Sequence, residues 1–167
     1  LHWLVARDKM PIQREWSDQP VASVEYLAAT HHSNANIGVR LGAPSRIAGG
    51  FLHLVDLDIR DSSQAADAWA ALVELWPAAK SFPMVQSGSG GESRHIYFIT
   101  DKPFGKKKLR KSVGFSMVFS TKLNREVKKY DWEIDVLGTG AQAVIPPSIH
   151  PDSGKPYRWI TRPDFDF

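Results

Sequence analysis

Residues 51–59 read FLHLVDLDI, and this stretch decides the fold. Its first half is apolar, which is typical of a strand that lies inside a sheet. Residues i and i+2 of a strand point to the same face, so Asp56 and Asp58 project together. The alternate apolar residues turn toward the core: Val55, Leu57 and Ile59. The stretch therefore predicts a buried strand that ends in a pair of carboxylates.

Two carboxylates at the end of a buried strand repel each other unless a cation lies between them. Their hard oxygen atoms favour Mg²⁺ or Mn²⁺ as that cation. Such ions serve phosphoryl and nucleotidyl transfer, because they neutralise developing charge and align the attacking oxygen. The alternative is that Asp56 and Asp58 only close the strand and cap the helix that follows.

A third acid is available in residues 131–136, which read DWEIDV. Strand alternation places Trp132, Ile134 and Val136 on one face and the acids Asp131, Glu133 and Asp135 on the other. Spacing alone does not choose between Glu133 and Asp135 as a partner of the Asp pair.

The remaining pattern predicts an α+β chain with mixed or antiparallel pairing. A helix over residues 64–76 begins after Asp61 and ends before Pro77, and a short helix capped by Ser23 extends to about residue 32. Further strands are expected at residues 36–41, 82–86, 94–100, 114–120, 130–137, 142–145 and 157–160.

Residues 87–92 (SGSGGE) form a glycine-rich turn that leads into a strand rather than a helix. Neither a dinucleotide-binding fingerprint nor a P-loop therefore fits. In the strand that follows, Ser93 and His95 point to one face, where a hydroxyl and an imidazole can donate hydrogen bonds to phosphate oxygens. The alternative for His95 is a structural histidine, as we expect for His53.

The composition is that of a globular protein, and 167 residues fit one domain, 1–167. The chain contains no cysteine, which excludes disulfides, thiolate zinc sites and cysteine nucleophiles and suits a reducing cytoplasm. No apolar run is long enough to span a bilayer, so we expect a cytoplasmic protein without a membrane partner.

The net charge is +3, and basic residues concentrate in residues 102–111, KPFGKKKLRK. One interpretation is a solvated turn or an exposed helix face. The other is a strip that contacts nucleic-acid phosphates, because each neutralised phosphate adds salt-dependent affinity. The residues of that strip would be Lys106, Lys107, Lys108, Arg110 and Lys111.

Three segments follow one another in the chain: LVDLDI, then GSGGESRHIYF, then WEIDVLGTGAQAVIPPSIHPDSGKPYRW. In their order and spacing they resemble the N-terminal domain family of bifunctional DNA primase/polymerases (prim-pol), within the archaeo-eukaryotic primases. That family carries a hydrophobic D-x-D, a small-x-His strand and a hydrophobic-acid strand, commonly followed by Pro-Pro-Ser and a Gly-x-x-Tyr-x-Trp tail. The resemblance covers nearly the whole chain, but residues 103–129 match no motif of the family.

Under this resemblance, the distance to Pro-Pro-Ser selects Asp135 over Glu133 as the third carboxylate. Asp56, Asp58 and Asp135 are then expected to bind two divalent ions, Mg²⁺ or Mn²⁺. Ser93 and His95 are expected to contact the phosphates of the incoming nucleotide.

Two weaker candidates for nucleotide or template contacts are Arg40 and Ser148. The alternative for these residues is a structural role in a strand and in a turn.

The resemblance also implies an architecture and partners. The fold class would be α+β and archaeo-eukaryotic primase-like, with an RRM-like catalytic sheet packed with an N-terminal α/β lobe. The partners would be a DNA template and primer, NTP or dNTP substrates, and a helicase module fused downstream, since we expect a fragment of a longer protein that replicates a plasmid, phage or mobile element.

Two other functions stay open from the sequence. Clustered acids serve a metal-dependent nuclease or phosphodiesterase equally well. The basic segment is also compatible with a catalytically idle DNA-binding module of a replication initiator, although a phosphate-binding surface has no reason to gather carboxylates.

Overall fold

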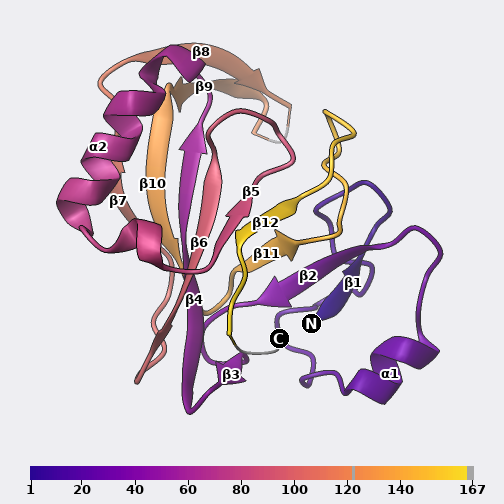
Figure 1. The fold of residues 1–167 in the computed structure, drawn as a ribbon. Helices are drawn as coiled ribbons and strands as arrows, with labels where there is room; N and C mark the ends of the chain where they lie inside the picture. Colours follow the sequence, from indigo (N-terminus) through magenta and orange to yellow (C-terminus); the bar gives the residue numbers. More distant parts are fainter. Residues whose placement is uncertain (122, 165–167) are drawn as a thin grey trace.

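The computed structural model describes residues 1–121 and 123–164 (Figure 1). Its largest sheet pairs all neighbouring strands antiparallel, with β4, Gly50–Ile59, in its interior. The spatial order is β12 (Arg158–Thr161), β5 (Met84–Gln86), β6 (Arg94–Thr100), β4, β10 (Trp132–Leu137) and β7 (Lys107–Lys111), and β3 (Arg46–Ile47) pairs with the start of β4.

Two smaller sheets accompany this main sheet. One consists of β1 (His2–Leu4), β2 (Asn36–Arg40) and β11 (Gln142–Ile145), again antiparallel. The other is a hairpin of β8 (Phe115–Ser120) and β9 (Arg125–Tyr130), which connects β7 to β10 along the chain. In Figure 1 this hairpin crosses the end of the main sheet at which β4 terminates.

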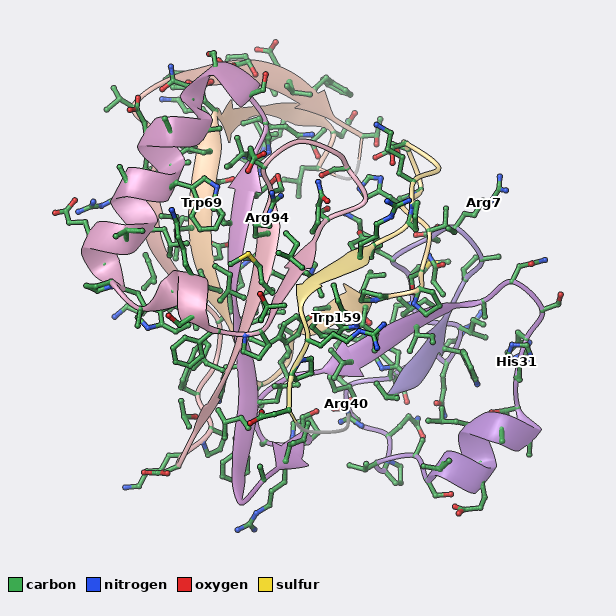
Figure 2. The ribbon with its side chains drawn as sticks, in the orientation of Figure 1. Arg7, His31, Arg40, Trp69, Arg94 and Trp159 are labelled. Atoms are coloured by element: carbon green, nitrogen blue, oxygen red, sulfur yellow. The ribbon has the colours of Figure 1, made fainter. Side chains whose placement is uncertain are left out.

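One helix, α2 (Ala65–Leu75), covers one face of the main sheet (Figure 1). Asp61 fixes its approach, because its carboxylate accepts a hydrogen bond from Ser63 N at 2.9 Å and caps the 3₁₀ turn η1, Ser62–Gln64. Trp69 points from α2 toward the sheet (Figure 2), and Ala68, Ala71 and Leu72 are buried. A second 3₁₀ turn, η2 (Ala79–Ser81), leads into β5.

The two faces of β4 are buried in different cores. Val55 and Leu57 pack under α2, whereas Leu52 and Leu54 pack against the small sheet of β1, β2 and β11. Asp56 and Asp58 share the parity of Leu52 and Leu54, so they continue the face opposite α2 toward the end of the strand. The alternation predicted for residues 51–59 is therefore confirmed.

The predicted helix at residues 64–76 is confirmed as α2, and the strands at 94–100 and 142–145 have the predicted bounds. Within the basic segment, residues 107–111 form the strand β7 rather than a turn or a helix. The strand expected at 130–137 divides at Asp131 into β9 and β10. The first helix is shorter than expected, and α1 (Val24–Ala29) buries no side chain.

The antiparallel sheets with few helices are compatible with the α+β, primase-like class expected from the sequence. Within the described ranges, no helix has the length and apolar content needed to cross a bilayer.

Candidate active site

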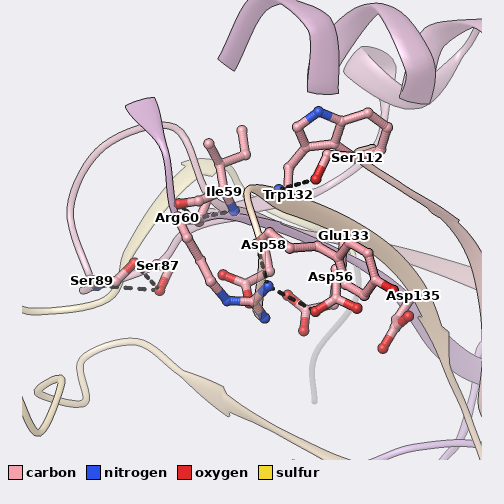
Figure 3. Close-up of polar contacts among 12 residues, drawn as sticks. Asp56, Asp58, Ile59, Arg60, Ser87, Ser89, Ser112, Trp132, Glu133 and Asp135 are labelled. Atoms are coloured by element: carbon pink, nitrogen blue, oxygen red, sulfur yellow. Dashed lines mark hydrogen bonds and ion pairs between the residues drawn. The ribbon is translucent and has the colours of Figure 1, made fainter. Parts of the chain in front are cut away.

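Four acidic side chains gather on the face of the main sheet opposite α2 (Figure 3). The antiparallel register of β4 and β10 places Asp135 directly opposite Asp56 and Glu133 directly opposite Asp58. Because i and i+2 share a face, both strands present both of their acids to the same side. The structure thus brings together the predicted set Asp56, Asp58 and Asp135, and it adds Glu133 to it.

Basic side chains form ion pairs with three of these acids. Arg60 bridges two of them, with Nη2 at 2.5 Å from Asp58 Oδ2 and Nη1 at 2.8 Å from Glu133 Oε2. Lys106 Nζ lies 2.8 Å from Asp135 Oδ2, and Lys108 forms ion pairs with both Glu133 and Asp135. The site is therefore a network of alternating charge rather than a bare acidic patch.

A β-bulge in β7 directs the lysines to this face. Lys108 pairs with Asp135 and Arg110 pairs with Ile134, so Leu109 is an extra residue with no partner in the register. Without the bulge, Lys108 and Arg110 would share one face by the period of two. With it, Lys108 joins the acids while Arg110 lies on the α2 side, with Nη1 at 2.6 Å from Glu74 Oε2.

The crowding of like charges is strongest at Asp56. Burial, followed by the negative charges of Asp58 and Asp135, raises the pKa of Asp56 to about 7. Asp135 Oδ1 is buried and has no hydrogen-bond partner among the described residues, with Lys108 Nζ 3.5 Å away. Both observations describe carboxylates whose charge the protein alone does not fully satisfy.

Among residues 1–121 and 123–164, no three His, Asp or Glu side chains form a ready-made group that could hold a metal ion. The donor set nevertheless suits a hard divalent cation: it consists of carboxylate oxygens, and it includes an acid with a raised pKa and a buried oxygen without a hydrogen bond. Binding would require Lys106, Lys108 and Arg60 to release carboxylate oxygens.

His95 completes the row across the sheet. It pairs with Asp56 on the side away from Asp135, and its Nε2 lies 3.7 Å from Asp56 Oδ1. Burial, together with the positive charge of Lys9, lowers the pKa of His95 to about 4, so the ring is neutral at pH 7. A neutral imidazole has one N–H donor and one acceptor, and either can meet a ligand at this row.

Ser93 is engaged with the protein backbone. Its hydroxyl accepts a hydrogen bond from Ile59 N at 2.9 Å and donates one to Ile59 O at 3.1 Å. The side chain is 4% exposed. Ser93 therefore links the end of β4, directly beyond Asp58, to the start of β6. Its one hydroxyl proton is already donated to Ile59 O.

Arg40 and Ser148 do not join the acids. The guanidinium of Arg40 donates to the carbonyls of Ser17 and Gln19, and Figure 2 shows the residue in the lower part of the molecule, whereas β4 terminates at the top of the same view. The Ser148 hydroxyl accepts a hydrogen bond from Ile37 N at 2.8 Å and is buried. Both residues organise the small sheet and the segments that pack on it.

The predicted basic strip is not a single surface. Lys106 and Lys108 pair with the site acids, and Arg110 pairs with Glu74 on the other face. Lys111 Nζ donates to the Tyr130 hydroxyl at 2.5 Å. By its register opposite Val136, Lys107 belongs to the α2 side.

Two residues near the acids were missed from the sequence. Arg60 had a readable signal, because it follows Asp58 by two residues and therefore shares its face. Lys9 had none: its loop is placed by long-range contacts, such as Asn36 Nδ2 to Asp8 O at 2.9 Å and Gln142 Nε2 to Lys9 O at 2.7 Å. After burial and the neighbouring carboxylates, Lys9 is the next influence on the pKa of Asp56.

One known protein family matches this chain. The model of the family "Bifunctional DNA primase/polymerase, N-terminal" matches residues 1–165. No curated protein and no solved structure gave a significant match. The match spans essentially the whole chain, and the chain therefore belongs to the prim-pol family.

Proposed function

We propose that this prim-pol domain is a template-directed nucleotidyltransferase that joins NTPs or dNTPs on DNA, with Asp56, Asp58 and Asp135 as ligands of two divalent ions, Mg²⁺ or Mn²⁺. Its role at the family level, that of a DNA primase/polymerase, comes from the family match. The observation that carries the residue assignment is the register that sets Asp135 opposite Asp56, two residues from Asp58 on the same face.

The bound ions would lower the pKa of the attacking 3′-hydroxyl and stabilise the leaving pyrophosphate. The protein's own part is to position the reactants and to supply fixed charges. Asp56, Asp58 and Asp135 lie on two paired strands, so their side chains share one face of the sheet. Lys106 and Lys108, released from Asp135, would be free to contact triphosphate oxygens.

His95 is the protein group best suited to the phosphates of the incoming nucleotide. Its low pKa keeps it neutral, so it donates a hydrogen bond without adding charge next to the metal ligands. For Ser93, two hydrogen bonds to Ile59 support a positioning role at the end of β4, and Arg40 and Ser148 are assigned to the scaffold on the same kind of evidence.

We further propose that residues 1–167 form one catalytic unit, in which the main sheet is the RRM-like catalytic sheet of a primase fold and the small sheet belongs to an N-terminal lobe. Replication of a plasmid, phage or mobile element, with a helicase module in the same protein, is the setting that this proposal favours. The two core clusters lie on opposite faces of β4 and share this strand, which supports a single unit.

The test is a template-directed assay with NTPs or dNTPs, with and without a primer, in Mg²⁺ or Mn²⁺. Asp58→Ala should reduce incorporation to background, while Asp101→Ala, in an exposed turn, should leave it unchanged. Normal incorporation by Asp58→Ala would refute the site assignment. Shortened DNA without added nucleotides would identify a nuclease, and absence of any Mn²⁺ binding by calorimetry would identify an idle DNA-binding module.

A further inference from the structure

The β8–β9 hairpin presents apolar side chains to solvent on one face. Phe115, Met117 and Phe119 alternate along β8 and are 43%, 50% and 58% exposed. Because they are two residues apart, all three point to the same side of the hairpin. Isolated exposed apolar residues are common, but a row of three on one face marks a contact surface.

Cationic groups lie on this same face. The register places Tyr130 opposite Phe115 and Lys128 opposite Met117. Lys128 Nζ is 4.0 Å from the centroid of the Phe115 ring, and Lys111 Nζ is 3.9 Å from that of Tyr130. The face therefore combines aromatic rings and a methionine side chain with ammonium groups close to two of the rings.

The hairpin is joined directly to the candidate active site. Arg60, which pairs with Asp58 and Glu133, also donates from Nη1 to the carbonyl of Tyr130 at 2.9 Å. Arg60 thus connects the acids to Tyr130, the first residue of the exposed row. The row continues along the hairpin through Phe115, Met117 and Phe119. Figure 1 shows the hairpin crossing the end of the sheet where β4 terminates.

We propose that this face, defined by Phe115, Met117, Phe119, Lys128 and Tyr130, binds the single-stranded template by stacking its bases on the apolar side chains. The proposal rests on the proposed function only for the identity of the nucleic acid as DNA template. Sequence-tolerant binding of single strands combines base stacking on aromatic side chains with cations that track the phosphates, and both elements occur here.

Charge favours a nucleic acid over a protein partner. Lys111 and Lys128 have their ammonium groups at the rings, whereas an apolar protein surface would require these charges to be desolvated. A single strand is favoured over a duplex, because unpaired bases expose the faces that stack and a duplex buries them. Glu126, opposite Phe119, is the one acid on this face of the described hairpin, and it would oppose binding.

The experiment measures the anisotropy of fluorescein-labelled oligo(dT) with the whole chain, without nucleotides or divalent ions. The double variant Met117→Ser/Phe119→Ser should raise Kd at least about tenfold, because it removes one stacking ring and the apolar contact beside it. Lys128→Gln should raise Kd and lower the salt slope more than Lys129→Gln, which makes the same charge change on the opposite face. Glu126→Gln should lower Kd.

Circular dichroism of each variant establishes that the fold is retained, as we expect for exposed positions. An unchanged Kd for the double variant, equal effects of the two lysine variants, or equal affinity for duplex DNA would each overturn the proposal. So would a dimer, seen by light scattering, that the double variant abolishes while oligo(dT) binding persists. Because this binding assay contains no nucleotides or divalent ions, its result does not depend on catalysis, so failure of the proposed chemistry and failure of this surface are distinguishable.

Discussion

Asp56 on β4 and Asp135 on β10 face each other directly across an antiparallel strand pair. Like charges in this position destabilise a sheet, and such violations of local stability occur mainly at functional sites. The row continues on both sides, to His95 on β6 and to Lys108 on β7. One rung of the sheet thus carries an imidazole, two carboxylates and an ammonium group.

The first prediction concerns the stability cost of Asp56. Its pKa in the folded protein, about 7, lies above the ordinary value of 3.8, so the folded state binds the proton more tightly than the unfolded state. Deprotonation therefore costs stability progressively as pH rises from about 4 to about 7. In metal-free buffer, Asp56→Asn should raise Tm at pH 8 and have little effect at pH 4.

Because the Asp56 side chain is 34% exposed, screening limits the gain to on the order of 1 kcal/mol, or about 2–4 °C in Tm. Thermal melts monitored by circular dichroism over this pH range give the comparison. Asp101→Asn, in an exposed turn, is the control and should not show the trend. A lower Tm of Asp56→Asn at pH 8 would contradict the like-charge argument.

The second prediction is that Arg60→Gln separates stability from metal affinity. Loss of the bridge between Asp58 and Glu133 should lower Tm without metal, since their negative charges then repel. The same loss frees Asp58 and one oxygen of Glu133, so saturating Mn²⁺ should raise Tm more in the variant than in the wild type. Arg158→Gln, on the exposed β12, should leave both values unchanged, and an equal Mn²⁺ shift in all three proteins would refute this role of Arg60.

The third prediction distinguishes two roles for Ser93. As a link between β4 and β6, its hydroxyl serves both backbone groups of Ile59, and Ser93→Ala should lower the free energy of unfolding by about 1–3 kcal/mol. Urea denaturation measures this value. A raised KM for nucleotide with unchanged stability would instead assign Ser93 to the triphosphate.

The fourth prediction concerns which of the two acids of β10, Glu133 or Asp135, is the third metal ligand. Asp135 is buried and lies opposite Asp56, whereas Glu133 lies opposite Asp58 and is bridged to it by Arg60. Asp135→Asn should abolish Mn²⁺-dependent incorporation, and Glu133→Gln should retain a measurable fraction of it. Calorimetric Mn²⁺ titration of both variants provides a readout independent of turnover, and the reverse order of effects would exchange the two assignments.

The fifth prediction tests the division of the basic segment. Lys111→Gln should reduce the slope of log Kd against log salt for single-stranded DNA by about 1, because Lys111 lies on the hairpin's binding side. Arg110→Gln removes the same charge on the α2 face and should leave the slope unchanged while it weakens the contact with Glu74. Equal slopes for the two variants would restore the single phosphate strip expected from the sequence.

The sequence predicted those parts of the structure that depend on local periodicity. Residues 51–59 combine an apolar run with alternation at Asp56 and Asp58, and strands 94–100 and 142–145 are bounded by turn residues, so these strands could be recognised directly. The pairing of Asp56 with Asp135 could not, because register between distant strands is a tertiary property. Only the family resemblance favoured Asp135.

The basic segment illustrates what local patterns do not contain. Consecutive lysines have no apolar period, so residues 107–111 gave no strand signal, although they form β7 and pair with β10. Ser93, Arg40 and Ser148 have backbone partners contributed by distant segments, which no spacing in their own neighbourhood reveals. For the same reason, the position of Lys9 near Asp56 emerged only from the folded chain.

The extra residue in β7 also bears on how this strand tolerates changes of length. Deleting Leu109 would leave a regular ladder in which Lys108 still faces Asp135 and Lys111 still faces Glu133. Deleting Lys108 instead would bring Leu109 opposite Asp135 and place a methyl-bearing side chain among the acids. Related chains that differ in length within this strand should therefore gain or lose their residue at the position of Leu109, where an insertion or deletion leaves the charged row intact.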